Sequence, residues 1–314
     1  MTEIVVTAPA RLHFGMLDPA GEASRRFGGF GAGVDHPRVV VEASACAEGV
    51  RAEGEEAERA QAFAARCWTR FGEPGGVHVV VREAIPPHMG LGSGTKLGLA
   101  IAAALAEVAG VPASPLGLAA ASGRGARSSV GIWTFAAPGL VVEGGVRDEA
   151  GISPLIARHP LPDAWRCVLA LPQGPEGLAG GAEERAFALL RGGGGREANV
   201  SRLLLTALLP GLIDGDIEEF GAALTAIQHE VGSLFADQQG GIYHPSAAPV
   251  VAALLELGVP GVGQSSWGPA VYGIVESVDR AVAVAAELAG LNADVRVVDF
   301  DRDGARVERR IEVP

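Results

Sequence analysis

A glycine-rich loop that runs directly into an apolar helix offers the clearest chemistry in this sequence. The loop and the helix start contain Gly90, Gly92, Ser93, Gly94 and Thr95, and the apolar residues that follow recur at helical spacing. A helix start leaves about four backbone N–H groups without intrahelical partners and carries a partial positive charge. Because glycines let that backbone approach a phosphate closely, we expect an anion-binding site here.

Lys96, in the first turn of this helix, is the only lysine in the chain. A cation at a helix start is disfavoured by the helix dipole, and a bound polyphosphate would reverse that penalty. We therefore predict that Lys96 contacts a polyphosphate. The alternative interpretation is a structural turn before a core helix, with a lysine there by chance.

Three further segments carry side chains that suit the same anionic ligand. Arg11 and His13 lie two apart on a predicted strand and so face the same side. Arg26 precedes a glycine-dense loop at residues 28–33, and arginine binds carboxylate or phosphate through two parallel hydrogen bonds. A loop at residues 123–131 adds four more candidates: Arg124, Arg127, Ser128 and Ser129. A strand with one polar face, a mobile surface loop and a solvated turn are the respective alternatives.

A fourth segment, residues 261–269, places polar and aromatic side chains between glycines, just before an apolar strand. Its candidates are Gln264, Ser265, Ser266 and Trp267. A tryptophan and a glutamine could hold an aromatic ring and its substituent, whereas the alternative is a structural turn with a buried tryptophan. The histidines show no metal-ligand spacing, so we expect no protein-built metal site.

Composition limits the classes of partner and the cell compartment. The net charge of −12 argues against nucleic acid or an anionic membrane surface as the main partner. The three cysteines are far apart, and the chain starts with a predicted strand instead of a signal peptide. The most apolar stretch, residues 97–111, is short and interrupted by Glu107. We expect a cytoplasmic protein of about two domains without a membrane span.

The remaining patterns predict an α+β chain in which strands and helices alternate irregularly. Proline and turn residues predict a domain link within residues 147–162. Strands are predicted at residues 4–8, 11–16, 38–43, 77–82, 132–135, 140–143, 165–171, 270–275, 294–300 and 305–311. Helices are predicted at 55–71, after the glycine loop, and at 114–122, 182–190, 197–209, 216–235, 246–257 and 278–288.

Taken together, these four segments resemble the GHMP kinase superfamily. The stretch from Pro86 to Ser93, Pro-x-x-x-Gly-Leu-Gly-Ser, matches its phosphate-binding signature. The resemblance implies a two-domain fold, with a domain like ribosomal protein S5 domain 2 at residues 1–155 and a ferredoxin-like domain at 156–314. The active site would lie between them, and members of the superfamily often form homodimers.

Within the superfamily the chain is most similar to the β-ribofuranosylaminobenzene 5′-phosphate synthases. The motifs at residues 11–15, 25–31, 123–131 and 263–269 carry this similarity. It implies condensation of 5-phosphoribosyl 1-pyrophosphate with 4-aminobenzoate or 4-hydroxybenzoate. Carbon dioxide and pyrophosphate are released on the way to tetrahydromethanopterin. The sequence does not decide between the two acids.

The positions at which this chain departs from the kinases also favour the synthases. Many of the kinases carry an aspartate in the stretch that corresponds to residues 123–129, where this chain has Arg127 and no acid. A phosphoryl-transfer enzyme would lose the carboxylate that orients its acceptor hydroxyl. An ATP-dependent small-molecule kinase is the alternative function.

The resemblance also implies roles for the candidate residues. Pyrophosphate, with a Mg²⁺ ion carried by the substrate, would bind the loop backbone and Lys96, and Arg124 and Arg127 would hold the 5′-phosphate or the aryl carboxylate. Asp18 or Asp35 would stabilise the positive ribose carbon or hold Mg²⁺. The four residues from Gln264 to Trp267 would shape the aryl pocket.

Overall fold

The computed structural model describes residues 2–311 apart from 73–74, 126, 148–150, 176, 178–179 and 191–194. The described strands form two sheets, and the larger has seven strands with the central order β11-β1-β2-β4-β3; β5 pairs with β2 and β6. These strands are β1 (Thr2–Asp18), β2 (Phe27–Cys46), β3 (Val50–Gly54), β4 (Gly76–Glu83), β5 (Leu140–Glu143), β6 (Leu155–His159) and β11 (Arg306–Ile311).

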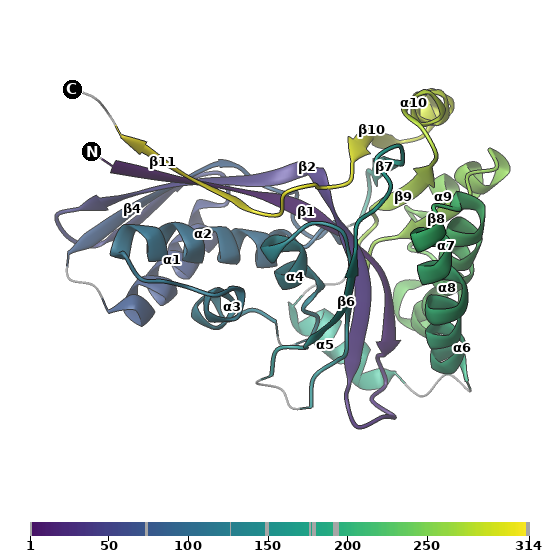
Figure 1. Cartoon of the computed structure of the whole chain (residues 1–314), viewed down its shortest axis with the longest axis horizontal. Coiled ribbons are helices and arrows are strands. Elements are labelled where there is room, and N and C mark those ends of the chain that lie inside the picture. Colours follow the sequence, from purple (N-terminus) through teal and green to yellow (C-terminus); the bar gives the residue numbers. More distant parts are fainter. Residues whose placement is uncertain are drawn as a thin grey trace.

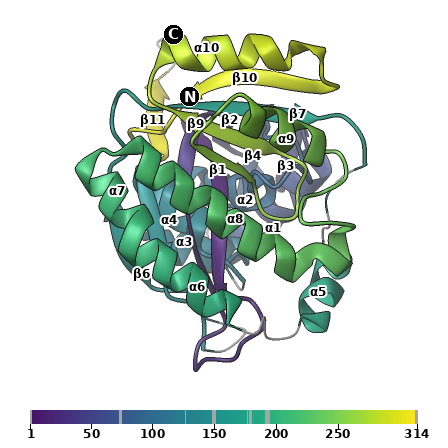
Figure 2. The same ribbon diagram turned by 90° about the vertical axis from the view of Figure 1, so that its right-hand side faces the viewer.

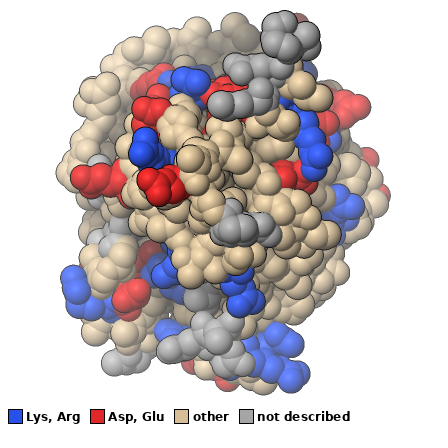
Figure 3. Space-filling view, turned by 90° about the vertical axis from the view of Figure 1, so that its left-hand side faces the viewer, with Lys and Arg blue, Asp and Glu red and all other residues tan. Residues whose placement is uncertain are grey.

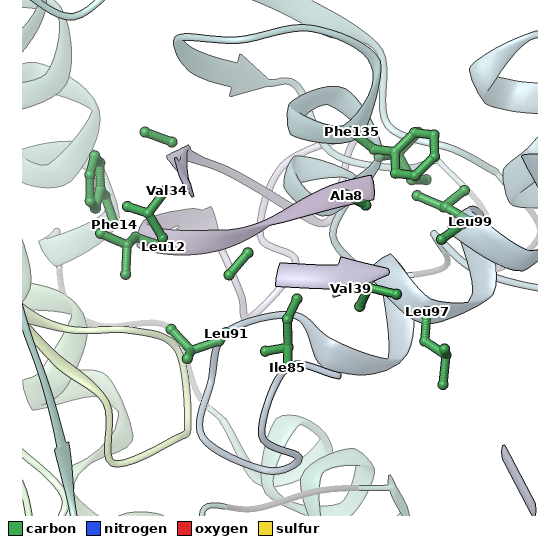
Figure 4. Packing of buried hydrophobic residues seen from close by; sticks show 14 of the residues in the cluster. Ala8, Leu12, Phe14, Val34, Val39, Ile85, Leu91, Leu97, Leu99 and Phe135 are labelled. Atoms are coloured by element: carbon green, nitrogen blue, oxygen red, sulfur yellow. The ribbon is translucent and has the colours of Figure 1, made fainter. Parts of the chain in front are cut away.

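Helices from the N-terminal half cover one face of the larger sheet (Figure 1). They are α1 (Ala57–Phe71), α2 (Ser93–Ala109), α3 (Pro115–Ser122) and α4 (Val130–Ala136). Leu97 and Leu99 of α2 belong to the same buried cluster as Ala8 and Val39 of the sheet, and Figure 4 shows these side chains between helix and strands. This burial holds the start of α2 in a fixed position against the sheet.

The smaller sheet has the strand order β10-β7-β9-β8 and packs between two sets of helices (Figure 2). Alternation along β7 sends Val168 and Ala170 into one core and Cys167 and Leu169 into the other. Helices α9 and α10 pack on the first side, and α8 packs on the second. The elements of this half are β7 (Arg166–Pro172), α5 (Gly180–Leu189), α6 (Arg196–Leu203), the π-helical turn η1 (Leu204–Leu208), α7 (Leu209–Asp214), α8 (Ile217–Gln239), α9 (Ala248–Glu256), β8 (Gly261–Gln264), β9 (Val271–Val275), α10 (Val278–Glu287), the 3-10 turn η2 (Leu288–Gly290) and β10 (Ala293–Asp299).

The glycine-dense segment 28–33 is a buried strand, so its prediction as a loop is wrong. It forms the first part of β2 and pairs with both β1 and β5. A Cβ atom at Gly31 would lie 2.1 Å from the carbonyl oxygen of Leu12. The glycines are therefore needed for the close approach of two strands, a role that local sequence does not distinguish from a turn.

Two other predictions change in the structure. Residues 132–135 belong to the helix α4 instead of a strand, because a short apolar run fits either element. The predicted strands at 4–8 and 11–16 are one continuous strand, β1, with a register shift between Pro9 and Ala10. The predicted helix at 114–122 is confirmed as α3, with the Ser114 side chain accepting a hydrogen bond from the N–H of Gly117.

Both halves of the chain contribute to the larger sheet. Strand β6, which begins at the predicted boundary of 155/156, pairs with β5, and the C-terminal strand β11 returns to pair with β1. The sheets therefore do not divide the chain at that boundary, and residues 148–150 of the predicted link lie outside the described residues.

The α+β class with its two sheets is confirmed. None of the described helices is long and apolar enough to cross a bilayer.

Acidic and basic side chains lie close to one another on the face at the left of Figure 1, which Figure 3 draws in space-filling form. Elsewhere in the described sheet, ion pairs join neighbouring strands, such as Arg82 of β4 with Glu42 of β2 at 2.5 Å. Ion pairs with a solvent-exposed partner contribute little to stability. This face is therefore electrostatically mixed despite the net charge of −12.

Candidate active site

The glycine loop (residues 86–92) leads into α2 without a side-chain cap. Gly90 has φ 80° and the N-cap residue Gly92 has φ 77°, backbone conformations that favour glycine. No side chain caps the helix start. The first N–H groups of α2, from Ser93 to Thr95, therefore have no partner within the helix and lie at the positive end of the helix dipole, which is the arrangement that binds an anion.

Three arginines from three different segments surround this helix start. Arg11 of β1 donates a hydrogen bond to the carbonyl oxygen of Gly90, and Arg124 lies 3.3 Å from the Thr95 hydroxyl through Nη2. A Cβ atom at Gly94 would lie 2.7 Å from Nη2 of Arg59, so that arginine also reaches the first turn. Burial lowers the pKa of Arg11 to about 10, so the guanidinium stays charged at neutral pH.

Arg59 was not a candidate from the sequence, although a signal for it was present. Arg59 and Arg66 lie seven residues apart on α1, which puts them on one face of the helix. A Cβ atom at Gly123 would lie 1.7 Å from Nη1 of Arg66, so this face of α1 points at the arginine loop (residues 123–131). Both α1 and the arginine loop therefore add positive charge around the start of α2.

A carboxylate that the sequence reasoning missed lies among these arginines. Glu183, in the first turn of α5, forms an ion pair with Arg127 at 3.0 Å. Burial raises the pKa of Glu183, while the charges of Arg127, Arg11 and Arg124 act in the opposite direction. The arginine cluster is thus partly neutralised by an internal acid. Because Glu183 lies in a helix far from these arginines in the sequence, no local pattern indicated this contact.

Lys96 does not reach the helix start, which corrects the expectation that it contacts a polyphosphate. Its side chain is fully buried, and Nζ lies 3.0 Å from the Thr134 hydroxyl of α4. Burial lowers the pKa of Lys96 to about 7. The amine points into the layer between α2 and α4, so in this conformation it cannot touch a ligand bound outside the helix.

The arginine loop ends in a buried hydrogen-bond network. Glu143 of β5 accepts hydrogen bonds at Oε1 from the Ser128 hydroxyl at 2.8 Å and the Ser129 N–H at 2.9 Å. Ser128 Oγ also lies 3.2 Å from Nε2 of His13. The Ser129 hydroxyl accepts from the N–H of Ser153, so Ser129 supports the loop from inside.

The tryptophan turn (residues 264–269) is joined directly to the glycine loop. The Ser265 hydroxyl donates to the Gly90 carbonyl oxygen at 2.7 Å and accepts from the N–H of His13 at 2.9 Å. Ser266 takes the left-handed conformation at φ 57°. Segments from both halves of the sequence therefore meet at one place, as the prediction of a shared site requires.

A narrow pocket lies beside this turn. Its polar lining includes His13, Gln264 and Ser266, together with the glutamines Gln228 and Gln239 of α8. Its cavity volume is about 30 Å³, which suits a group the size of a water molecule, whereas a cavity that binds benzene measures about 150 Å³. An aromatic ring therefore fits only when its walls move apart.

Trp267 closes this pocket within an aromatic cluster. Its ring centroid lies 4.2 Å from that of Phe235 and 5.3 Å from that of Phe187 of α5. The indole Nε1 is buried and has no hydrogen-bond partner among the described residues. Trp267 thus connects the pocket to α5, the helix that carries Glu183.

Three predicted site residues have other roles in the structure. Asp18 accepts hydrogen bonds from the backbone N–H groups of the turn that follows it, at 2.7 to 2.9 Å. Asp35 accepts from the N–H of Asp299 and so ties β2 to β10. Arg26 donates to the carbonyl oxygens of Pro19 and Phe187. These are contacts with backbone groups, and among the described residues no hydrogen bond or ion pair joins these three side chains to the arginines around α2.

Comparisons with known proteins give matches in both halves of the chain. Family models described as GHMP kinases N terminal domain and GHMP kinases C terminal match residues 58–134 and 208–293. A beta-ribofuranosylphenol 5′-phosphate synthase of Methanothermobacter thermautotrophicus is 31% identical over 92% of this chain and 94% of that protein. One of the same name from Archaeoglobus fulgidus is 31% identical over 86% of this chain and 87% of that protein.

Solved structures show the same fold at low identity. A homoserine kinase from Cytophaga hutchinsonii superposes with a TM-score of 0.72 and 18% identity, covering 98% of this chain and 97% of that one. The mevalonate kinase of Methanococcus jannaschii gives a TM-score of 0.70 at 10% identity, covering 95% and 98%. At these identities the likeness concerns the fold alone.

Proposed function

The chain belongs to the beta-ribofuranosylphenol 5′-phosphate synthase family, which has the GHMP kinase fold, and from this premise we propose the reaction that it catalyses. The enzyme is a decarboxylating pentosyltransferase that joins 5-phosphoribosyl 1-pyrophosphate to 4-hydroxybenzoate. Carbon dioxide and pyrophosphate are released, and a β-ribofuranosyl-aryl 5′-phosphate is formed for tetrahydromethanopterin biosynthesis. The name of the relatives refers to a phenol, which favours 4-hydroxybenzoate over 4-aminobenzoate.

The uncapped start of α2, with arginines converging on it from three segments, carries this proposal. Arg11, Arg59 and Arg124 supply cations, and α2 supplies backbone N–H groups. Such a site stabilises a diphosphate as it leaves the ribose. The arginine loop has Arg127 where a kinase would place its acceptor-orienting acid, so the site favours a departing anion over phosphoryl transfer.

We further propose that Mg²⁺ arrives with the pyrophosphate group of the substrate. Magnesium is usually bound through substrate phosphates and one or two carboxylates. Glu183 is a carboxylate that lies among the arginines, so it can offer an oxygen ligand to that ion; Glu56, at the start of α1, is paired with Arg59 at 2.6 Å. Arg127 is released from its ion pair in that arrangement and is free to hold the aryl carboxylate or the 5′-phosphate.

We place the enzyme in the cytoplasm, because its three cysteines are unpaired thiols and two of them are buried. Reducing compartments keep thiols in that state. A homodimer stays a prediction from the family, and light scattering on the purified chain measures it.

The proposed reaction is tested by mixing the protein with 5-phosphoribosyl 1-pyrophosphate, Mg²⁺ and carboxyl-labelled 4-hydroxybenzoate. We expect labelled carbon dioxide in equal amount to pyrophosphate. Arg124→Ala removes a charge partner of the leaving group and is expected to lower turnover by about 10²–10³. Arg296→Ala, which removes an exposed arginine on β10, is the matched control and should keep full activity.

Two outcomes contradict the proposal. Formation of ADP from ATP and a small alcohol, with no labelled carbon dioxide, would identify a kinase. Turnover in Arg124→Ala within about threefold of the unchanged protein would show that pyrophosphate leaves from another place.

A further inference from the structure

A buried line of hydrogen bonds runs from β5 to β1 through the arginine loop. Glu143, the last residue of β5, is fully buried, and its Oε1 accepts from the Ser128 hydroxyl at 2.8 Å. Ser128 Oγ in turn lies 3.2 Å from Nε2 of His13. Neither Glu143 nor the order of this line was evident from the sequence, because the three residues come from three separate segments.

The direction of these hydrogen bonds determines which nitrogen of His13 carries the proton. Oε1 of Glu143 also accepts from the Ser129 N–H, so it is an acceptor even if a proton sits on Oε2. The single hydroxyl proton of Ser128 is therefore committed to Glu143. Ser128 can only accept from His13, which places the imidazole proton on Nε2 and leaves Nδ1 as an acceptor.

His13 is a neutral imidazole in this environment. Burial, with the nearby charge of Arg11, lowers the pKa of His13 to about 3. A neutral ring with one N–H has one acceptor nitrogen. Nδ1 has no hydrogen-bond partner among the described residues, so this acceptor is available to a ligand.

The pocket beside the tryptophan turn brings a small donor group to His13. His13 lines this pocket, whose volume of about 30 Å³ admits one hydroxyl or amino group. The amide oxygens of the three glutamines are already used: Gln228 and Gln239 accept from Gln264, and Gln264 accepts from the N–H of His244. The Ser266 and Tyr243 hydroxyls on the lining carry protons and can also donate, so the His13 ring is the unused group of the lining that can only accept at its free nitrogen.

We propose that Nδ1 of His13 accepts a hydrogen bond from the 4-hydroxyl of the aromatic acid, and that Ser128 and Glu143 are positioning residues that maintain its tautomer. This inference rests on the proposed function, since it names a substrate contact of the same site. It makes a hydrogen-bond donor at the 4-position a requirement for binding. A fluorine of similar size cannot meet that requirement.

The contact also has a role in the reaction. As the ring carbon bonds to C1 of ribose, the bond from C1 to pyrophosphate breaks and its electron pair leaves with pyrophosphate. The ring then withdraws electrons from the hydroxyl oxygen, whose proton passes to Nδ1 of His13. When the bond to carbon dioxide breaks, its electron pair restores the ring and the oxygen takes the proton back. A hydroxyl on a ring that has lost its aromaticity is strongly acidic, so a weak base is sufficient.

The tautomer is measured directly by ¹⁵N NMR of the full chain labelled at histidine, with His13→Asn used to assign the signal. We expect His13 to be neutral with its proton on Nε2 across pH 5–8. We then titrate the protein with 4-hydroxybenzoate and with 4-fluorobenzoate in the presence of pyrophosphate. The fluoro compound is expected to bind at least about tenfold more weakly, because it covers the Nδ1 acceptor without donating a hydrogen bond to it.

Ser128→Ala removes the acceptor that holds the Nε2 proton. In this variant we expect both tautomers to coexist and the preference for 4-hydroxybenzoate over 4-fluorobenzoate to shrink. Ser122→Ala removes another fully buried hydroxyl, on α3, and should leave both measurements unchanged.

A proton on Nδ1 in the unchanged protein, or equal binding of the two acids, would overturn the inference even if labelled carbon dioxide is released. The expected tautomer and preference without release of carbon dioxide would instead overturn the proposed reaction and leave the hydrogen-bond assignment in place.

Discussion

At the scale of single residues, Lys96 shows how burial changes the meaning of a charge. Its position at the start of α2 suits a phosphate ligand, yet its amine lies against Thr134 and is fully buried. Burial is the main reason that the pKa of Lys96 falls to about 7; the negative charge of Asp301 opposes this change and Arg11 adds to it. Holding this amine in its charged form therefore lowers the stability of the folded protein.

We predict that Lys96→Met stabilises the protein at neutral pH. The unfolded chain keeps the lysine proton up to about pH 10.5, whereas the folded chain releases it near pH 7. The unfolded state thus binds more protons in this window, and the free energy of unfolding rises with pH by up to about 1.4 kcal/mol per unit. In Lys96→Met this rise with pH is absent. We expect the free energy of unfolding of the variant to exceed that of the unchanged protein by at least about 1 kcal/mol at pH 7, and the difference to shrink toward pH 10.

Urea unfolding of both proteins at pH 6, 7, 8 and 9 measures this difference. Because the other titrating groups are common to both proteins, the difference isolates Lys96. Parallel pH profiles would show that the amine titrates normally in the folded state.

At the scale of elements, α5 brings an acid to a site built from arginines. Phe187 packs its ring against Phe27 at 5.4 Å and against Trp267, and Arg26 donates to the Phe187 carbonyl oxygen. These contacts hold the C-terminal part of α5, while its first turn presents Glu183 to Arg127. An anionic ligand that approaches the arginines must therefore displace this carboxylate or bring a cation that it can bind.

We predict that Glu183→Gln reverses the preference of the site between metal-free pyrophosphate and its Mg²⁺ complex. Metal-free pyrophosphate should bind about fivefold more tightly, because a competing negative charge among the arginines is removed. Its Mg²⁺ complex should bind more weakly, because a carboxylate ligand is lost. Calorimetric titration at constant ionic strength measures both affinities.

Glu184→Gln is the matched control for this experiment, because Glu184 is the exposed neighbour on the same helix. It should leave both affinities near those of the unchanged protein. Equal effects of the two substitutions would indicate a general electrostatic change and contradict a specific role for Glu183.

At the scale of the whole molecule, the two halves of the sequence are in backbone contact at the site. A Cβ atom at Gly268 would lie 2.0 Å from the backbone nitrogen of Gly90. The N–H of Ala270 donates to the Met89 carbonyl oxygen at 3.1 Å, and the N–H of Gly177 donates to the His88 carbonyl oxygen at 3.2 Å. The glycine loop, Gly177 and the tryptophan turn are therefore joined to one another through backbone contacts.

We predict that Gly268→Ala separates these segments and lowers both stability and activity. Overpacking of this kind costs about 1–3 kcal/mol, and for a chain of 314 residues we expect a fall in Tm of about 2–5 °C. Release of labelled carbon dioxide should fall in parallel, since the anion site and the pocket lose their relative position. Calorimetry and the activity assay measure the two effects.

Gly290→Ala is the control for this substitution, because a Cβ atom there would meet nothing within 4 Å. It should melt close to the unchanged protein and keep its activity. If Gly268→Ala behaved in the same way, the contact between loop and turn would not position the site.

The sequence by itself determined the features that depend on neighbouring residues. The glycines before Ser93 predict a helix start with free N–H groups, and the structure has α2 begin there. The family motifs and the α+β class were also readable, because they lie in continuous segments. Such features follow from local backbone chemistry, which contiguous residues specify.

Only the tertiary structure decided which side chains reach the site. It brought Arg59, Glu143 and Glu183 to it and turned Lys96 away. Asp18 became a cap for its own turn, and residues 28–33 became a strand. The physical reason is that a side chain's direction, burial and partners depend on segments distant in sequence, which meet only when the sheets and helices pack.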